Sequence, residues 1–254
     1  MVLTIDIGNT TIGIGAFSEN TLCLYEKISS TEELTDFDYM DKLKNIFQTH
    51  GLSLDSLEGS IISSVVPRIT PIFKKALAQW TNKPALVLSY EMKLGIEMKV
   101  DNPEKVGCDR IADAVGAAMK YPLPLITIDM GTATTINVVD GQYHFRGGII
   151  MPGVGTAGQA LLSKTAQLSG GDMDMPAHTI GTNTRECITS GMIYGNACAI
   201  AGLIARINEE LGSSCTVIAT GGYAGIVIPY CKTDIILDQH LLMKGLKNLF
   251  DSNK

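Results

Sequence analysis

The chain has 254 residues, of which 45% are hydrophobic and 18% are charged, and its formal net charge at pH 7 is −6. This length suits one or two domains with a core that needs no cross-links. The acidic balance and the lack of a basic run argue against nucleic-acid binding, so we expect no nucleic-acid partner. The six cysteines lie far apart, without the paired spacing of zinc sites or disulfide frameworks, which indicates reduced thiols and a cytoplasmic protein.

Neither a signal peptide nor a membrane span is expected from the sequence. The apolar stretch before Asp6 is short and lacks a cleavage region, and no apolar run reaches the length of a span. We therefore expect no membrane partner.

The first part of the chain is predicted to open with three strands and then to alternate helices and strands. Apolar spacing and the glycines and prolines between the runs predict strands over 2–7, 12–17 and 22–28, a helix over 35–50, a strand within 59–67, a helix over 70–81 and a strand over 85–88. Apolar residues dominate the first strand, as is typical of a central strand. The segment DNPEKVGCDR then predicts a helix that begins near Pro103, with Asn102 as its N-cap.

The second part of the chain repeats this plan. Its predicted elements are a strand within 123–131, a hairpin around the Asp140-Gly141 turn, helices over 155–169 and 184–211, strands over 215–220 and 234–237, and a closing helix from Gln239. The repeat predicts an α/β fold of two duplicated halves, residues 1–118 and 119–254, each with a mixed sheet. The loops after the two first strands should then meet at a cleft between the halves.

Two loops carry the same residue types after a buried strand: DIGNT begins at Asp6, and DMGT begins at Asp129. Glycine lets backbone N–H groups approach phosphate oxygens, hydroxyl side chains add donors, and aspartate offers a hard oxygen ligand to the cation of a nucleotide. Either loop alone is more simply a hairpin turn, but the pair favours a clamp on the polyphosphate of ATP. The chain lacks the P-loop and dinucleotide-binding patterns. A third glycine turn, IATGGYAG, suits a close approach to adenosine and is equally a plain strand-to-helix turn.

In chain order, the motifs DIGNTTIG, DNPEKVGCDR, DMGTATT, GGIIMPG, ALLSKTAQL, IGTNT and SGMIYG make the sequence similar to type III pantothenate kinases, a family of the sugar kinase and actin superfamily. The resemblance covers nearly the whole chain, and VGCDR and IGTNT separate this family from other kinases of the superfamily. It implies duplicated ribonuclease H-like (actin-like ATPase) domains, each a mixed five-stranded sheet with helices, and an ATP cleft between them. The implied activity is the ATP-dependent phosphorylation of pantothenate to 4′-phosphopantothenate, the first step of coenzyme A biosynthesis.

The resemblance also assigns residues around the acceptor substrate. Asp109 matches the family's proton acceptor, and the substrate-binding positions match Gly107, Cys108, Asp109, Arg110 and Thr184. Arg110 suits the carboxylate of pantothenate. From the residues alone, Asp109 and Arg110 are also compatible with solvated charges on an amphipathic helix, and Thr184 with a helix N-cap. Asp113, one turn after Asp109, is a second candidate for the base.

Nucleotide and cation positions follow from the same resemblance. The ATP-binding positions match Asp6, Ile7, Gly8, Asn9, Thr10, Thr11, Ile12, Gly13 and Thr132. Asp6 is expected to bind Mg²⁺, and Asp129 matches the position that holds a monovalent cation, K⁺ or NH₄⁺. In the family the pantothenate pocket lies at a dimer interface, so the resemblance implies a homodimer.

One position departs from the family. Members often have a tyrosine before the NP segment that contributes to the pantothenate pocket, and this chain has Val100 there. Either Tyr90 or another residue replaces that contact, or the pocket binds its substrate differently.

Two other functions stay open. One is a non-catalytic transcriptional accessory protein on the same fold, and the other is a different small-molecule kinase of the superfamily, such as a sugar kinase. The acidic charge balance and the presence of Asp6, Asp109 and Asp129 argue against the first, and VGCDR argues against the second.

Overall fold

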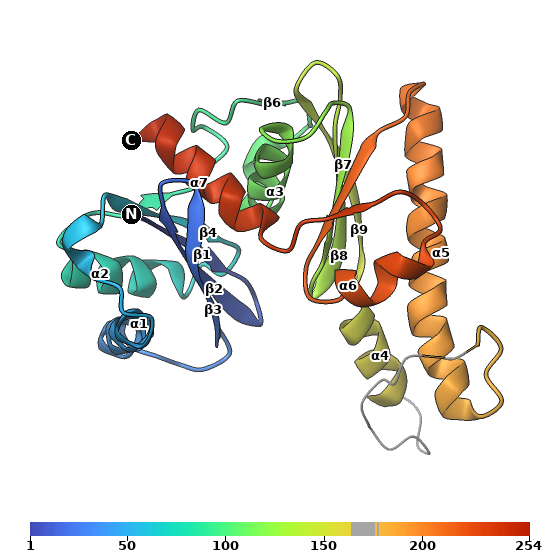
Figure 1. Cartoon of the computed structure of the whole chain (residues 1–254), viewed down its shortest axis with the longest axis horizontal. Helices are drawn as coiled ribbons and strands as arrows, with labels where there is room; N and C mark the ends of the chain where they lie inside the picture. The colour runs from blue at the N-terminus through green and yellow to red at the C-terminus, as the bar shows by residue number, and fades with distance from the viewer. Residues whose placement is uncertain (164–175, 177) are drawn as a thin grey trace. The chain divides into compact units, whose positions relative to one another are not determined.

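The computed structural model describes residues 1–163, 176 and 178–254 (Figure 1). Contacts group them into two compact units, one of Met1–Lys120 with His240–Lys254 and one of Tyr121–Gln239. Each unit contains helices and strands that pair both parallel and antiparallel, which confirms the predicted mixed α/β class.

The sheet of the first unit has the strand order β3-β2-β1-β4-β5. Its strands are β1 (Val2–Ile7), β2 (Thr11–Ser18), β3 (Thr21–Ser29), β4 (Gly59–Ser64) and β5 (Leu86–Val87). The residues of the first unit also include the short strand β6 (Glu97–Met98), which is not part of this sheet. β1 is central: it pairs antiparallel with β2 and parallel with β4, where Asp6 lies opposite Ser63. The predicted meander and the two strands after it are confirmed.

The two faces of β1 pack against different pairs of helices. The helices of this unit are α1 (Asp36–Thr49), α2 (Thr70–Thr81), α3 (Cys108–Ala118) and α7 (Leu241–Asn253), with short 3-10 turns at Leu54–Ser56 and Pro103–Lys105. Ile5 lies in a buried cluster with residues of α1 and α2, whereas Val2 and Ile61 lie in one with residues of α3 and α7. Because side chains alternate along a strand, Asp6 and Ser63 lie on the face that α3 and α7 cover.

Helix α3 begins later than the sequence predicts. Its first residue is Cys108, and Pro103–Lys105 form a separate 3-10 turn. Val106 and Gly107 are extended, with ψ of 127° and 136°, and this break stops the turn from continuing into the helix. A Cβ on Gly107 would overlap Oδ1 of Asp109, so the break fits glycine and leaves Asp109 in the first turn of α3.

The closing helix α7 packs against α3, β1 and β4 of the first unit. The backbones of α3 and α7 touch where they cross, because a Cβ on Gly245 would overlap the carbonyl oxygen of Ala112. The repeat predicted this helix in the second half, residues 119–254, but contacts group 240–254 with the first unit. The reason is that apolar residues of α7, such as Leu246, complete the buried cluster with α3. The boundary at residue 118 itself stays a prediction.

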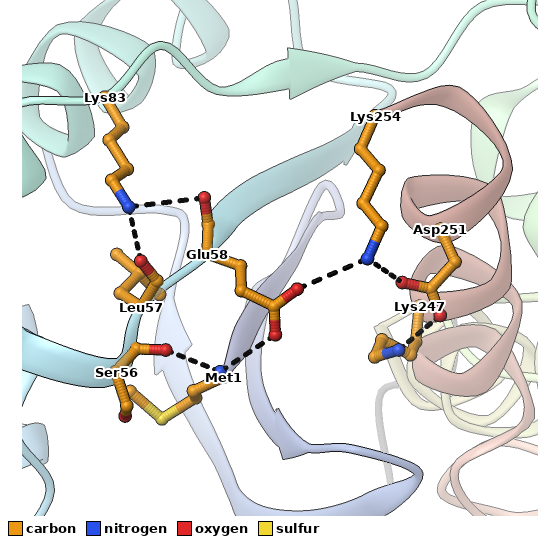
Figure 2. A network of polar contacts seen from close by, with 8 residues as sticks. All are labelled: Met1, Ser56, Leu57, Glu58, Lys83, Lys247, Asp251 and Lys254. Carbon is orange, nitrogen blue, oxygen red and sulfur yellow. Dashed lines mark hydrogen bonds and ion pairs between the residues drawn. The ribbon is translucent and has the colours of Figure 1, made fainter.

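Charged groups also connect the end of α7 to the residue before β4 (Figure 2). Glu58 pairs with Lys254 Nζ at 3.3 Å and with the amino group of Met1 at 3.2 Å, and Asp251 pairs with Lys247 and Lys254. The amino group of Met1, followed by Lys254, lowers the pKa of Glu58. Exposed ion pairs contribute little to stability, so the apolar contacts of α7 carry most of its attachment.

The strands of the second unit lie in the order β11-β10-β7-β8-β9. They are β7 (Leu125–Met130), β8 (Ala133–Val139), β9 (His144–Pro152), β10 (Thr216–Thr220) and β11 (Ile236–Leu237). β7 pairs antiparallel with β8 and parallel with β10, so Asp129 lies between Thr135 and Thr220. This repeats the arrangement around β1, as the duplicated pattern predicts.

The helices of the second unit are α4 (Val154–Ser163), α5 (Thr184–Leu211) and α6 (Ala224–Val227), followed by a 3-10 turn at Ile228–Tyr230. α5 has the bounds that the sequence predicts. α4 begins one residue before the predicted start, and the rest of that prediction, together with the end of the ALLSKTAQL motif, lies outside the described residues.

Helix α5 differs from the expectation that no run is long and apolar enough to span a membrane. Among the described residues it is the one helix that meets this test, with a mean hydropathy of 1.5 over its best window. Length and composition alone are weak evidence, because core helices of soluble proteins pass the same test. Ile193, Ala197 and Ile200 of α5 lie in the buried cluster of the second unit, as in a core helix.

Candidate active site

The loop after β1 is a tight turn at the carboxyl end of the strand. Gly8 N donates to Thr11 O at 3.0 Å, and the loop is joined to the end of β3 because Ser30 N donates to Thr10 O at 3.1 Å. The side chains of Asn9, Thr10 and Thr11 are exposed. These are the residues of the predicted ATP loop whose side chains are open to a ligand.

Other residues predicted in that loop are buried. Ile7 and Ile12 are fully buried in the cluster with α1 and α2, and Gly13 lies against Met243 of α7. The side chains of Ile7 and Ile12 therefore build the core, and only the backbone groups of these three residues can contact a nucleotide.

Asp6 is partly buried and held by the neighbouring strand. Ser63 Oγ donates to Asp6 Oδ1 at 2.9 Å, and the two residues are paired in the parallel register of β1 and β4. A fixed carboxylate at the end of a central strand is a suitable hard ligand for a cation.

The first residue of α3 lies close to this carboxylate. Cys108 Sγ donates to Leu88 O at 3.1 Å. Burial raises the pKa of the Cys108 thiol; a backbone hydrogen bond with Ser64 opposes the shift, and the charges of Asp109 and Asp6 add to it. A Cβ on Gly107 would lie 3.5 Å from Val65, the residue that follows β4, so the start of α3 lies near the end of the strand whose Ser63 bonds to Asp6.

The surroundings of Asp109 shift the pKa of its carboxyl group. Burial raises its pKa, while the backbone N–H of Arg110, which donates to Oδ1 at 2.8 Å, and the Arg110 charge oppose that rise. Burial lowers the pKa of Arg110, and Asp109 opposes that shift. A carboxylate with a raised pKa is a better proton acceptor than an ordinary aspartate. Asp113, the second candidate, is only 1% exposed, so a substrate hydroxyl reaches Asp109 more readily.

The loop after β7 in the second unit has a similar construction. Gly131 N donates to Ala133 O at 3.0 Å, which closes the turn one residue earlier than at Gly8. Thr132 is exposed, and its carbonyl accepts from Gly153 N at 3.1 Å and from Thr156 Oγ1 at 2.6 Å. The first turn of α4 therefore holds Thr132 in place.

A glycine turn lies against Asp129 at the end of β7. Gly221 has φ of +91°, and a Cβ there would overlap Asp129 Oδ1. Tyr223 N, from the same turn, donates to Met130 O at 3.2 Å. The backbone of the IATGGYAG turn is therefore in contact with the carboxylate of Asp129. This is the carboxylate that the resemblance assigns to K⁺ or NH₄⁺.

The IGTNT motif forms the start of α5. Asn183, not Thr184, is the N-cap, and its side chain accepts from Glu186 N at 3.0 Å. Glu186 in turn accepts from the backbone and the hydroxyl of Thr182, which lower its pKa. Thr184 is the first helical residue and is exposed, so its hydroxyl is not used as the cap.

The donor set at Asp6 fits the predicted Mg²⁺. Mg²⁺ in phosphate-transfer sites usually takes one or two carboxylates together with substrate phosphates, and Asp6 offers one partly buried carboxylate beside a glycine turn. Across the described ranges, no three His, Cys, Asp or Glu side chains form a cluster able to hold a metal.

Sequence reasoning missed the residues that hold the predicted ones. Ser63, Leu88 and Thr156 bond to Asp6, Cys108 and the Thr132 carbonyl across elements that are distant in sequence. One signal was present, because Ser63 follows the apolar pair Ile61 and Ile62 near the carboxyl end of β4. That Asp6 and Asp129 share one nucleotide cleft stays a prediction.

The family model for type III pantothenate kinase matches residues 2–206. The chain is 39% identical to the type III pantothenate kinase of Exiguobacterium sibiricum and 35% identical to that of Brevibacillus brevis, in both cases over 100% of each chain. Among solved structures, one described as a Baf family transcriptional activator from Campylobacter jejuni matches with a TM-score of 0.60 at 18% identity, covering 98% of this chain and 97% of that one.

Component A of the (R)-2-hydroxyglutaryl-CoA dehydratase of Acidaminococcus fermentans matches with a TM-score of 0.56 at 12% identity, covering 99% of this chain and 95% of that one. These structures support the actin-like ATPase fold alone. The matched family model and the full-length identities place the sequence more narrowly: the chain belongs to the type III pantothenate kinase family.

Proposed function

We propose that this protein transfers the γ-phosphoryl group of ATP to the primary hydroxyl of pantothenate, giving 4′-phosphopantothenate and ADP. This is the first step of coenzyme A biosynthesis, and the cytoplasm is its expected location. One observation supports the chemistry: Asp109 follows Cys108, which bonds to Leu88, and Leu88 bonds to β4, the strand whose Ser63 holds Asp6. The proposed proton acceptor and the proposed cation ligand are thus both attached to β4, which suits phosphoryl transfer to an alcohol.

Residues of the first unit have different roles in the proposed phosphoryl transfer. Asp109 accepts the proton of the pantothenate hydroxyl as its oxygen bonds to the γ-phosphorus, and the bond between the γ-phosphorus and the β–γ bridging oxygen breaks to release ADP. Arg110 pairs with the carboxylate of pantothenate. Asp6 would hold Mg²⁺, which when bound would neutralise charge on the phosphates, and the loop 8–11 offers backbone and hydroxyl donors to phosphate oxygens.

The second unit supplies the other nucleotide contacts. Thr132 is exposed at a turn that α4 fixes, and it contacts ATP. Asp129 would hold K⁺ or NH₄⁺, since a large monovalent ion suits a carboxylate together with backbone oxygens. Thr184, exposed at the start of α5, contacts pantothenate.

We also propose that the protein is a homodimer. The outward side of α5 carries small, exposed residues at helical spacing, namely Gly191, Gly195, Cys198 and Gly202. Nothing in the described chain packs on the three glycines, so a second helix can approach them closely. Sedimentation equilibrium tests this, and a monomer at micromolar concentration would contradict it.

A regulatory role is the second candidate, favoured by the likeness to the structure described as a transcriptional activator. The net charge of −6 opposes direct contact with DNA. The two roles differ in whether Asp109 is needed, because a regulator has no use for a general base.

A coupled assay of ADP release tests the proposed activity. Purified protein is incubated with ATP and, in separate reactions, pantothenate, a set of sugars, or acetate, with and without Mg²⁺ and K⁺ or NH₄⁺. ADP release only with pantothenate and with both cations is the expected result. Release with a sugar, or none with any acceptor, would contradict it.

A further inference from the structure

Ser63 is a buried hydroxyl residue on the strand next to Asp6. It is 0% exposed, and its Oγ donates to Asp6 Oδ1 at 2.9 Å. The two residues are paired in the parallel register of β1 and β4, so their side chains leave the sheet at the same level and on the same face. The contact is therefore part of the sheet geometry and does not depend on a flexible loop.

The hydrogen bond restricts the carboxylate of Asp6. With Oδ1 bonded to Ser63, the carboxylate cannot rotate without losing a charge-assisted bond inside a poorly solvated site. The bond therefore fixes the direction in which the Asp6 carboxylate faces a ligand. Groups that hold metal ligands in this way commonly change metal affinity when they are removed.

We propose that Ser63 is the positioning residue for Asp6 and, through it, for the divalent cation of the bound nucleotide. This inference rests on the proposed function, because it assumes that Asp6 binds that cation. Ser63 itself touches neither nucleotide nor acceptor. Its removal should weaken cation binding and leave the affinity for pantothenate unchanged.

The same strand offers a matched control. Ser60 is also buried, at 1% exposed, and lies three residues earlier on β4, opposite Leu3. Its Oγ has no hydrogen-bond partner in the described part of the chain. Ser60→Ala therefore removes the same atom from the same strand without touching Asp6, and it reports any general effect of a lost hydroxyl on the sheet.

The experiment measures Mn²⁺ binding by electron paramagnetic resonance, in the presence of a non-hydrolysable ATP analogue and without pantothenate. We expect Ser63→Ala to weaken Mn²⁺ binding by about 10- to 100-fold. Ser60→Ala should stay within about two-fold of the unmodified protein, and Ser63→Thr, which keeps the hydroxyl, should recover most of the affinity. In steady-state assays, Ser63→Ala should raise the Mg²⁺ concentration for half-maximal rate, with the KM for pantothenate unchanged.

The outcomes separate the two proposals. If Ser63→Ala binds Mn²⁺ as Ser60→Ala does, while the unmodified protein is active, the role of Ser63 is wrong and the proposed function stands. If the unmodified protein neither binds Mn²⁺ with the analogue nor phosphorylates pantothenate, the proposed function fails first. If Ser63→Ala does not fold, Ser63→Cys replaces it, because a thiol keeps about the same volume and is a weaker donor. A Mn²⁺ affinity of Ser63→Cys equal to that of the unmodified protein would then overturn the inference.

Discussion

The thiol of Cys108 donates a hydrogen bond of 3.1 Å to the carbonyl oxygen of Leu88, which attaches the first residue of α3 to the segment after β5. Leu88 N in turn donates to Ile62 O of β4 at 2.8 Å. The start of α3, and with it Asp109, is thus connected to the same strand that holds Asp6 through Ser63. Both predicted acidic residues of the first unit are positioned from β4.

Replacing Cys108 tests this attachment. Cys108→Ala removes the donor, and we expect it to lower the free energy of unfolding by about 1 kcal/mol and to reduce kcat, because Asp109 is the next residue. Cys108→Ser keeps a donor and should retain more of both. Thermal unfolding and initial rates measure the two effects, and an alanine variant as stable and active as the serine variant would count against the attachment.

The crossing of α3 and α7 leaves no space at Gly245. Gly245→Ala would bring a Cβ onto the carbonyl oxygen of Ala112, so the helices must separate, and we expect a loss of about 1–3 kcal/mol of unfolding free energy. Gly158→Ala, inside α4 and with only Met192 Sδ at 3.9 Å, is the matched control and should be neutral or stabilising. Denaturant unfolding compares them, and equal stability of the two variants would argue against the tight crossing.

Gly221 is predicted to matter for the monovalent cation. Gly221→Ala strains a residue with φ of +91° and overlaps the carboxylate of Asp129, so the K⁺ concentration that gives half-maximal activity should rise by about tenfold or more. Gly212→Ala has a similar strain, at φ of +65°, but no atom lies within 4 Å of its Cβ. A K⁺ titration that gives the same shift for both variants would show that strain, not contact with Asp129, is responsible.

Asp109 should reduce stability while it is charged. Its pKa is raised by burial, so the folded protein binds this proton more strongly than the unfolded chain does. At a pH above both pKa values, the ionised carboxylate therefore lowers the free energy of unfolding, and Asp109→Asn should raise the melting temperature at pH 7.5. The gain should shrink as the pH falls through the raised pKa. Asp101→Asn, at an exposed position, should show neither effect.

Local sequence patterns were enough for much of the fold. The two meanders, the Asp-Gly loops and the bounds of α5 follow from residue periodicity and turn chemistry within short windows. The start of α3 did not, because Pro103 is a good first helical residue and only the extended backbone at Val106 and Gly107 separates its turn from the helix. The asparagine-proline pattern indicates only that a helical turn begins at Pro103. It carries no information about the contacts that set the first residue of α3.

The remaining features depend on pairing between distant residues. The position of α7 follows from its apolar face and Gly245 meeting α3, which the repeat in the sequence does not reveal. The bond between Ser63 and Asp6 requires the parallel register of β1 and β4, 57 residues apart. In the same way, the contact of Gly221 with Asp129 exists only because β10 lies beside β7.

The most direct test of the account is the pH dependence of pantothenate phosphorylation by the unmodified protein and by Asp109→Asn. We expect kcat/KM of the unmodified protein to fall on the acid side with a pKa above that of an ordinary aspartate, and Asp109→Asn to lower kcat by about 10²–10⁴-fold and to lose that acid limb. An Asp109→Asn variant with the full kcat and an unchanged acid limb would contradict the claim that Asp109 accepts the proton of the substrate hydroxyl.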